Sequence, residues 1–334
     1  MSQSLSIALL VLVLANVSAP ARADEYSKKE PAKAENEPTR TENATVAELI
    51  AEIKATVKKR KYKWDLSVFS DEGFTVQSYS VNKNPLVYYT CGDRDSGNTS
   101  LIISGVHGDE VNPLYFGFRL VEWLRARPEL CKGGFVVIAP LVNPDGALRY
   151  TTGTRTNFNK IDVNRNFDTP DFAPLAMKMW REKFRSRRYY PGEKGGSEPE
   201  TQFQKWLIDE FKPAKIMSIH APLNVLDYDG PSTAAAGTDD FTKSYIDSCE
   251  SLKAAMKKAT PSLNFFAYGI FPGSLGNYAG KQRGIPTFTV ELPTTDPSSA
   301  GHFFSELEAG TRLFITQTVM QKQAKNSSSQ DSNN

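Results

Sequence analysis

The chain has 334 residues, 40 Lys and Arg against 38 Asp and Glu, a formal net charge of +2 and 40% hydrophobic residues. This is the composition of an ordinary globular protein that is long enough to bury a sizeable core. The balanced charge argues against a nucleic-acid partner. Three cysteines are too few for a disulfide-built scaffold or a paired-cysteine zinc module. The three histidines are His107, His220 and His302, so any histidine-based chemistry must use these.

A targeting segment is expected at the N-terminus. The stretch from Ile7 to Val17 is almost wholly apolar, yet it is too short to span a bilayer comfortably. The small-x-small cleavage signature Ala21-Arg22-Ala23 follows it. A buried core element is the alternative, but the run lies at the extreme N-terminus and precedes a charged stretch. We therefore predict a signal peptide over residues 1–23, cleavage after Ala23, and an exported protein with no stable membrane insertion.

Composition divides the remainder into a folded part and two polar flanks. Residues 24–44 are rich in charged residues and nearly devoid of apolar ones, which predicts a disordered linker. Residues 322–334 are rich in Ser and Asn and should form a disordered tail. We expect one folded domain over residues 45–321.

The folded part alternates strand and helix patterns. Thr45-Val-Ala-Glu48 is a capping box, and apolar residues at helical spacing then run to a basic stop after Val57. Strands are expected at 74–81, 86–91, 101–106, 135–140, 215–220 and 286–292, and helices at 111–126, 198–211, 239–258 and 302–319. This order predicts an α/β fold, a single domain with a mixed, mainly parallel twisted sheet flanked by helices. Functional sites in such folds gather beyond the carboxyl ends of the strands.

Three apolar strands end at ionisable residues. The strand at 101–106 leads into His107 and Glu110, another leads into His220, and a third into Glu291. Such groups are costly at the end of an apolar strand unless they are paired or ligated. His220 could instead be a core histidine bonded to backbone, and Glu291 a salt-bridged carboxylate. Together, however, two histidines and one glutamate match catalytic zinc, which keeps a fourth position open for water.

Six motifs occur in one order along the chain: Gly105-Val-His-Gly-Asp-Glu110, Asn143-Pro-Asp-Gly146, Arg155-Thr-Asn157, Asp162-Val-Asn-Arg-Asn-Phe167, Ser218-Ile-His220 and Val290-Glu-Leu292. As a set they make residues 70 to 320 resemble the zinc carboxypeptidase (carboxypeptidase A-like) family. The closest resemblance is to its murein peptide amidase A branch, the γ-D-glutamyl-meso-diaminopimelate peptidases. That branch is marked by His-Gly-Asp-Glu, Ser197-Glu-Pro-Glu-Thr201, His220-Ala-Pro-Leu223 and Val290-Glu-Leu-Pro293. Asp109 stands where the digestive members usually carry Arg, which argues against a food-protein carboxypeptidase.

The resemblance implies a metal site and a general base. His107, Glu110 and His220 would bind Zn²⁺, one ion per chain. Glu291 would accept a proton from the attacking water and pass it to the leaving amine.

The resemblance also implies the residues that hold the substrate. Arg155 would stabilise the oxyanion of the tetrahedral intermediate. Asn164 and Arg165 would clamp the terminal carboxylate of the substrate, because a guanidinium fits a planar carboxylate. Both arginines could instead form surface ion pairs. Tyr268 would be the tyrosine that closes over substrate, or a plain hydrophobic residue.

An exported zinc-dependent metallocarboxypeptidase is the function that follows from the resemblance. It would cleave the γ-D-glutamyl–meso-diaminopimelate bond of peptidoglycan tripeptides in the periplasm, with peptidoglycan stem peptides as its partners. One alternative is a secreted general carboxypeptidase that removes C-terminal L-amino acids. Others are a non-catalytic relative that binds wall peptides, and an esterase or deacylase.

Three further features have open interpretations. The basic residues from Arg181 to Arg188 are interrupted by aromatic ones and form a solvated helix face, a rim that attracts an anionic substrate, or a nucleic-acid patch. Export permits a Cys91–Cys131 disulfide that leaves Cys249 free, and three buried thiols are the alternative. His302 fits no motif and is expected on the surface near a helix N-terminus.

Overall fold

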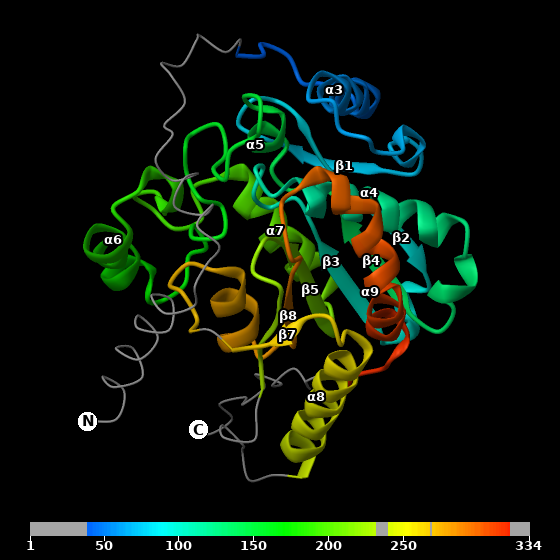
Figure 1. Cartoon of the computed structure of the whole chain (residues 1–334). Coiled ribbons are helices and arrows are strands. Elements are labelled where there is room, and N and C mark those ends of the chain that lie inside the picture. The colour runs from blue at the N-terminus through cyan, green and yellow to red at the C-terminus, as the bar shows by residue number, and fades with distance from the viewer. Residues whose placement is uncertain (1–38, 232–239, 268, 321–334) are drawn as a thin grey trace, which may run out of the picture.

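The computed structural model describes residues 39–231, 240–267 and 269–320. Within this part of the chain, eight strands form one sheet in the order β1-β2-β4-β3-β5-β8-β6-β7 (Figure 1). The strands are β1 (Thr75–Tyr79), β2 (Pro85–Gly92), β3 (Thr99–Ile103), β4 (Phe135–Ala139), β5 (Lys215–His220), β6 (Val225–Asp229), β7 (Asn264–Phe265) and β8 (Thr287–Glu291).

The middle of the sheet is parallel and its flanks are antiparallel. β4, β3, β5 and β8 run in the same direction. On one side β2 pairs antiparallel with both β1 and β4, and on the other side β6 pairs antiparallel with β8 and parallel with β7. Every residue of β3, β4 and β5 is buried, as expected for parallel strands covered on both faces. The predicted α/β fold with a mixed, mainly parallel sheet is confirmed.

Helices cover both faces of the sheet (Figure 1). The α-helices are α3 (Val46–Lys59), α4 (Val111–Arg125), α5 (Pro144–Leu148), α6 (Met177–Met179), α7 (Pro199–Phe211), α8 (Asp240–Ala259) and α9 (Ala300–Thr316). Ile102 faces a core that includes side chains of α4, α8 and α9. Leu101 and Ile103 point to the opposite face and pack with α7. This alternation follows from the two-residue period of a strand.

The element bounds lie close to the expected ones. The structure contains the capping box, in which the Glu48 backbone N–H donates to Thr45 Oγ1 and Glu48 accepts from the Thr45 backbone. β6 and β7 were not predicted. β6 contains the buried Asp227, which breaks its apolar pattern, and β7 has only two residues.

Part of the predicted linker packs against the domain. The backbone N–H of Ala44 donates to the carbonyl of Lys83 at 2.9 Å, and the backbone N–H of Arg40 donates to Asn82 at 3.0 Å. The predicted signal peptide, the rest of the predicted linker, the predicted tail at 322–334 and Tyr268 lie outside the described residues. Within the described residues, no helix combines the length and apolar character needed to cross a membrane.

The structure pairs two of the three cysteines and places the third histidine on the surface. Cys91 and Cys131 form a disulfide, and Cys249 is a buried free thiol. His302 is exposed in the first turn of α9, as the sequence predicted, with Nε2 at 3.6 Å from Glu306.

Candidate metal centre and active site

The first two candidate ligands lie in a tight connection between β3 and α4. β3 ends at Ile103, and α4 begins directly after Glu110, which occupies its N-cap position. The connection folds closely onto a second loop: a Cβ at Gly108 would lie 2.0 Å from a backbone atom of Gly146. Only glycine allows this approach, and it positions His107 and Glu110 beside the carboxyl ends of the neighbouring strands.

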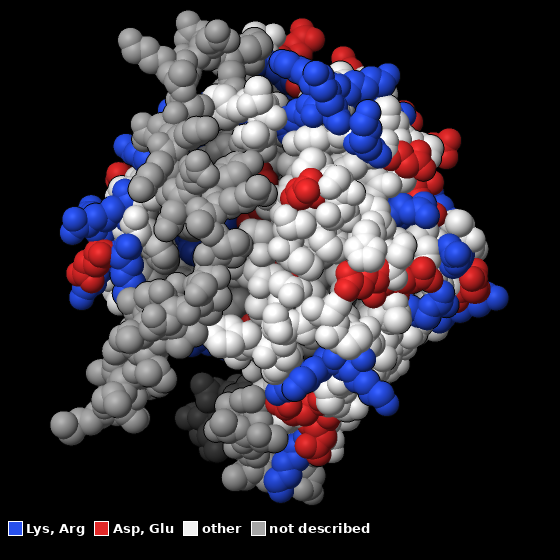
Figure 2. All heavy atoms as spheres, in the orientation of Figure 1, with Lys and Arg blue, Asp and Glu red and all other residues white. Residues whose placement is uncertain are grey.

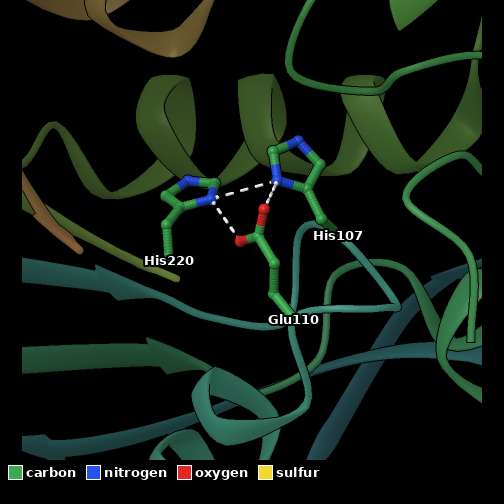
Figure 3. Close-up of side chains that lie close together, drawn as sticks. All are labelled: His107, Glu110 and His220. Atoms are coloured by element: carbon green, nitrogen blue, oxygen red, sulfur yellow. Dashed lines mark hydrogen bonds and ion pairs between the residues drawn. The ribbon is translucent and has the colours of Figure 1, made fainter. Parts of the chain in front are cut away.

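His107, Glu110 and His220 converge (Figure 3). The Glu110 carboxylate lies between the two imidazoles, with Oε1 at 2.7 Å from Nδ1 of His107 and Oε2 at 3.0 Å from Nδ1 of His220. The two Nδ1 atoms are 3.2 Å apart, and one ligand atom from each residue lies within 4.8 Å of the others. All three residues are buried. Two imidazole nitrogens and a carboxylate oxygen are the donor set of a catalytic zinc site.

Hydrogen bonds on the far side of each ring fix the orientation of both imidazoles. Nε2 of His107 lies 3.2 Å from Oδ1 of Asp162, and Nε2 of His220 lies 2.9 Å from Oγ of Ser218. Because the Nε2 atoms have these partners, the Nδ1 lone pairs can face the metal position. The residues present therefore fit a zinc ion.

Glu291 ends the strand next to His220. β5 and β8 are parallel, and His220 and Glu291 are paired in register, so their side chains share a face of the sheet. Glu291 is 9% exposed. Burial, together with the nearby Glu110 carboxylate, raises the pKa of Glu291 to about 7. A carboxyl group with such a pKa can both accept and return a proton near neutral pH.

Arg155 reaches the metal ligands from a third loop. Its Nη1 donates to Glu110 at 3.2 Å, and its Nε donates to Asp162 at 2.7 Å. Burial opposes its positive charge, but these two carboxylates more than offset that effect and hold the pKa of Arg155 above its usual value. A fixed cation therefore lies beside the metal position, where negative charge would develop in a tetrahedral intermediate.

A buried polar network holds the loop that carries Arg155. Nδ2 of Asn157 donates to Glu198 at 2.7 Å and to Glu200 at 2.8 Å, and both glutamates lie at the start of α7. Glu200 also accepts from the backbone of Val81. Burial, with a contribution from the nearby Asp145, raises the pKa of Glu200 to about 8. The sequence motifs did not suggest this anchoring role.

Asn164 and Arg165 directly follow the Asp162 turn. The backbone N–H of Asn164 donates to Asp162, and its side-chain oxygen accepts from Leu275 at 2.9 Å. The Arg165 guanidinium stacks over Phe271, with Cζ at 4.4 Å from the ring centroid. Both side chains are half-buried, so they remain accessible to a ligand.

Three aromatic rings form a row between Arg155 and Arg165. The rings of Tyr189 and Phe184 have centroids 4.9 Å apart, and those of Phe184 and Phe271 are 6.1 Å apart. Cζ of Arg155 lies 5.1 Å from the Tyr189 centroid, at the opposite end of this aromatic row from Arg165. Trp180–Phe184 forms a π-helix, so part of the predicted basic segment builds a wall of the site.

The structure thus brings together seven of the eight expected site residues, while Tyr268 lies outside the described part of the chain. Asp162 was in a motif but had no assigned role. It contacts a candidate ligand and Arg155, and its complete burial was not visible in the sequence. The ion pair between Asp109 and Arg188 was also missed, because these residues are 79 positions apart.

Comparisons with known proteins agree with this site. The family model for zinc carboxypeptidase matches residues 70–312. Murein peptide amidase A of Escherichia coli (strain K12) is 35% identical over 144 residues, which are 42% of this chain and 55% of that protein. The chain therefore spans about half the length of this relative. Murein peptide amidase A of Vibrio campbellii (strain ATCC BAA-1116) is 29% identical over 218 residues, 64% of this chain and 77% of that protein.

Solved structures show the same fold. Bovine thrombin-activatable fibrinolysis inhibitor, in complex with tick carboxypeptidase inhibitor, aligns with a TM-score of 0.56 and 18% identity over 82% of this chain and 96% of that chain. Carboxypeptidase A from Helicoverpa armigera aligns with a TM-score of 0.52 and 16% identity, over 82% of this chain and 74% of that one.

Proposed function

This chain belongs to the zinc carboxypeptidase family, and we propose that it cleaves the γ-D-glutamyl–meso-diaminopimelate bond of peptidoglycan tripeptides. The enzyme class is that of a zinc-dependent metallocarboxypeptidase. The observation that carries the substrate proposal is the similarity to relatives named murein peptide amidase A, which are 35% identical over 144 residues and 29% identical over 218 residues. Asp109, between two of the ligands, also separates this chain from digestive carboxypeptidases.

The strand-end residues perform the hydrolysis. Zinc held by His107, Glu110 and His220 supplies Lewis-acid polarisation and lowers the pKa of water. Glu291 accepts the proton of the attacking water on a carboxylate oxygen and then delivers it to the nitrogen of the leaving amine. The guanidinium of Arg155 stabilises the negative charge that develops on the carbonyl oxygen of the substrate.

The terminal carboxylate of the substrate binds at Asn164 and Arg165. Phe271 and the hydrogen bond from Leu275 hold the two side chains in place before substrate arrives. A pre-positioned guanidinium offers paired N–H donors to a planar carboxylate, so the scissile bond is one residue from the chain end.

Export to the periplasm is the location that we propose. The apolar stretch from Ile7 to Val17 and the Ala21-Arg22-Ala23 signature support it. The Cys91–Cys131 disulfide is a second support, because such bonds persist in oxidising compartments. On the face that Figure 2 shows, Lys and Arg side chains lie in several separate groups with Asp and Glu side chains among them, and they form no single basic patch.

Defined muropeptides test the substrate. Purified protein is incubated with uncrosslinked tripeptide, tetrapeptide and crosslinked muropeptides, and the products are identified by mass spectrometry. Tripeptide should become dipeptide plus free diaminopimelate, and the other two should resist.

A general carboxypeptidase is the second candidate, because the Asn164–Arg165 pair could hold the terminal carboxylate of any peptide. Benzoylated L-amino acids are therefore assayed in parallel. If they are hydrolysed well while tripeptide survives, the wall-peptide proposal is wrong and the second candidate replaces it.

A further inference from the structure

An ion pair next to the metal ligands has no part in the hydrolysis described above. Nη1 of Arg188 donates to Oδ2 of Asp109, the residue before Glu110. The Arg188 side chain is 38% exposed and the Asp109 side chain 20% exposed, so the pair lies at the surface of the site rather than in the core. One N–H of a guanidinium with five donors is engaged by Asp109, and others remain available to a ligand.

The aromatic row locates Arg188 relative to the other two arginines of the site. Tyr189 contacts both Arg155 and Arg188, with their Cζ atoms at 5.1 and 5.9 Å from the ring centroid. Arg165 stacks on Phe271, two ring contacts further along the row. Arg188 therefore lies at the Arg155 end of the site, opposite the end that would hold the terminal carboxylate.

The order of Arg165, Arg155 and Arg188 along the aromatic row can be compared with the order of the chemical groups along the substrate. With the terminal carboxylate at Arg165 and the scissile carbonyl at Arg155, the end marked by Arg188 receives the acyl side of the scissile bond. In a γ-linked D-glutamate, two methylenes and the α-carbon separate the scissile carbonyl from a free carboxylate. An ordinary α-peptide has an amide instead. A cation at this end therefore matches a γ-linked acyl residue, and not an α-linked residue with a neutral side chain.

We propose that Arg188 binds the free α-carboxylate of the γ-linked acyl residue and that Asp109 is its positioning residue. The inference rests on the proposed function, because it assigns a binding residue to that substrate. Asp109 also offsets the repulsion between Arg188 and Arg155, which lie on the same ring.

Two tripeptides that differ at one group test this assignment. The first is L-alanyl-γ-D-glutamyl-meso-diaminopimelate, and the second carries an amide in place of the α-carboxylate. For the unchanged enzyme, kcat/KM should favour the carboxylate form by roughly tenfold or more, the size expected for a charge-assisted hydrogen bond. Arg188→Gln should remove this preference by slowing only the carboxylate form.

Companion variants separate binding from folding. Arg188→Lys keeps the charge but loses the fork, so an intermediate preference is expected. Asp109→Asn should reduce the preference mainly through KM. Arg187→Gln is the matched control, since this neighbour is exposed and stacks on Tyr190, and it should keep the full preference. Because the preference is a ratio within each variant, a lower yield of folded protein cancels.

The outcomes distinguish this inference from the proposed function. Equal turnover of both tripeptides by the unchanged enzyme, or an equal loss on both in Arg188→Gln, overturns the role of Arg188 and leaves the peptidase assignment intact. The second result would mean that the ion pair stabilises the fold and does not bind the substrate. If the unchanged enzyme cleaves neither tripeptide, the proposed substrate is wrong and this inference is overturned with it.

Discussion

Asp162 and Arg155 form a buried ion pair, in which Nε of Arg155 donates to Oδ2 of Asp162 at 2.7 Å and the carboxylate is fully buried. The other carboxylate oxygen lies 3.2 Å from Nε2 of His107. One side chain therefore orients both a candidate metal ligand and the cation expected to stabilise the oxyanion. Removal of such a partner leaves an uncompensated buried charge.

Asp162→Asn should lower both zinc affinity and kcat. An amide cannot serve as a charged acceptor for His107 and Arg155 together, so we expect zinc affinity to fall roughly tenfold to a hundredfold. Zinc titration with a competing chelator measures this. Asp168→Asn is the control, because Asp168 pairs with Lys205 at the surface. Equal zinc affinity in both variants would contradict the orienting role.

The amount of bound zinc should depend on His107 and His220 but not on His302. We expect about one Zn²⁺ per chain, since one ligand set is present among the described residues. His107→Ala together with His220→Ala should abolish both zinc binding and activity, whereas His302→Ala should leave both unchanged, because its side chain is 74% exposed on α9. Elemental analysis that finds full zinc in the double variant would show that the ligands lie elsewhere.

Glu291→Gln should separate metal binding from chemistry. The amide keeps the shape of the side chain but cannot accept a proton, so zinc should stay bound while kcat falls by roughly a hundredfold or more. The variant should also trap bound substrate, which mass spectrometry under native conditions can detect. Glu308→Gln, on the exposed side of α9, is the matched control. Near-normal turnover in Glu291→Gln would make Glu291 a structural residue.

Arg165→Lys should raise KM and lower kcat/KM, because lysine keeps the charge but loses the planar fork. Amidation of the substrate's terminal carboxylate should harm the unchanged enzyme strongly and add little further loss in Arg165→Ala. Steady-state kinetics with both substrate forms measure this coupling. Additive losses would mean that a different residue holds the terminal carboxylate.

Stability should depend on pH through Glu200. Its pKa is raised from 4.5 to about 8 by burial, so between these values the folded protein keeps a proton that the unfolded chain has lost. The free energy of unfolding therefore decreases as pH rises through this window, by at most ~1.4 kcal/mol per pH unit for one proton, and levels off above about 8. Glu200→Gln cannot titrate.

The measurement compares the two proteins by denaturant unfolding across that window. The stability of Glu200→Gln relative to the unchanged protein should rise steadily with pH, whatever the absolute difference between them. A constant difference across the window would show that Glu200 titrates normally in the folded state.

The candidate ligands could be predicted from the sequence because each ends a continuous apolar strand or lies just beyond it. Local patterning marks strands and their ends, so the predicted strand at 215–220 coincides with the observed β5, and His220 is its last residue. The positions of Glu110 and Glu291 followed from the same reasoning. Here local order along the chain was sufficient.

Contacts between distant loops could not be predicted in this way. Asp162 meets His107, and Arg188 meets Asp109, only because several irregular segments fold over the sheet edge. Nothing in the local sequence specifies those paths. The buried Asp227 likewise concealed β6, because a polar residue inside a strand contradicts the expected apolar pattern.

The pairing of His220 with Glu291 makes hydrogen-bond register a determinant of catalysis. A slip of β8 by one residue against β5 would turn the Glu291 carboxylate to the opposite face of the sheet and leave the imidazole where it is. Activity is therefore all-or-none with respect to strand alignment, and a collapsed but misaligned sheet would be inert. During refolding, enzymatic activity should therefore return only when β5 and β8 have reached their native alignment.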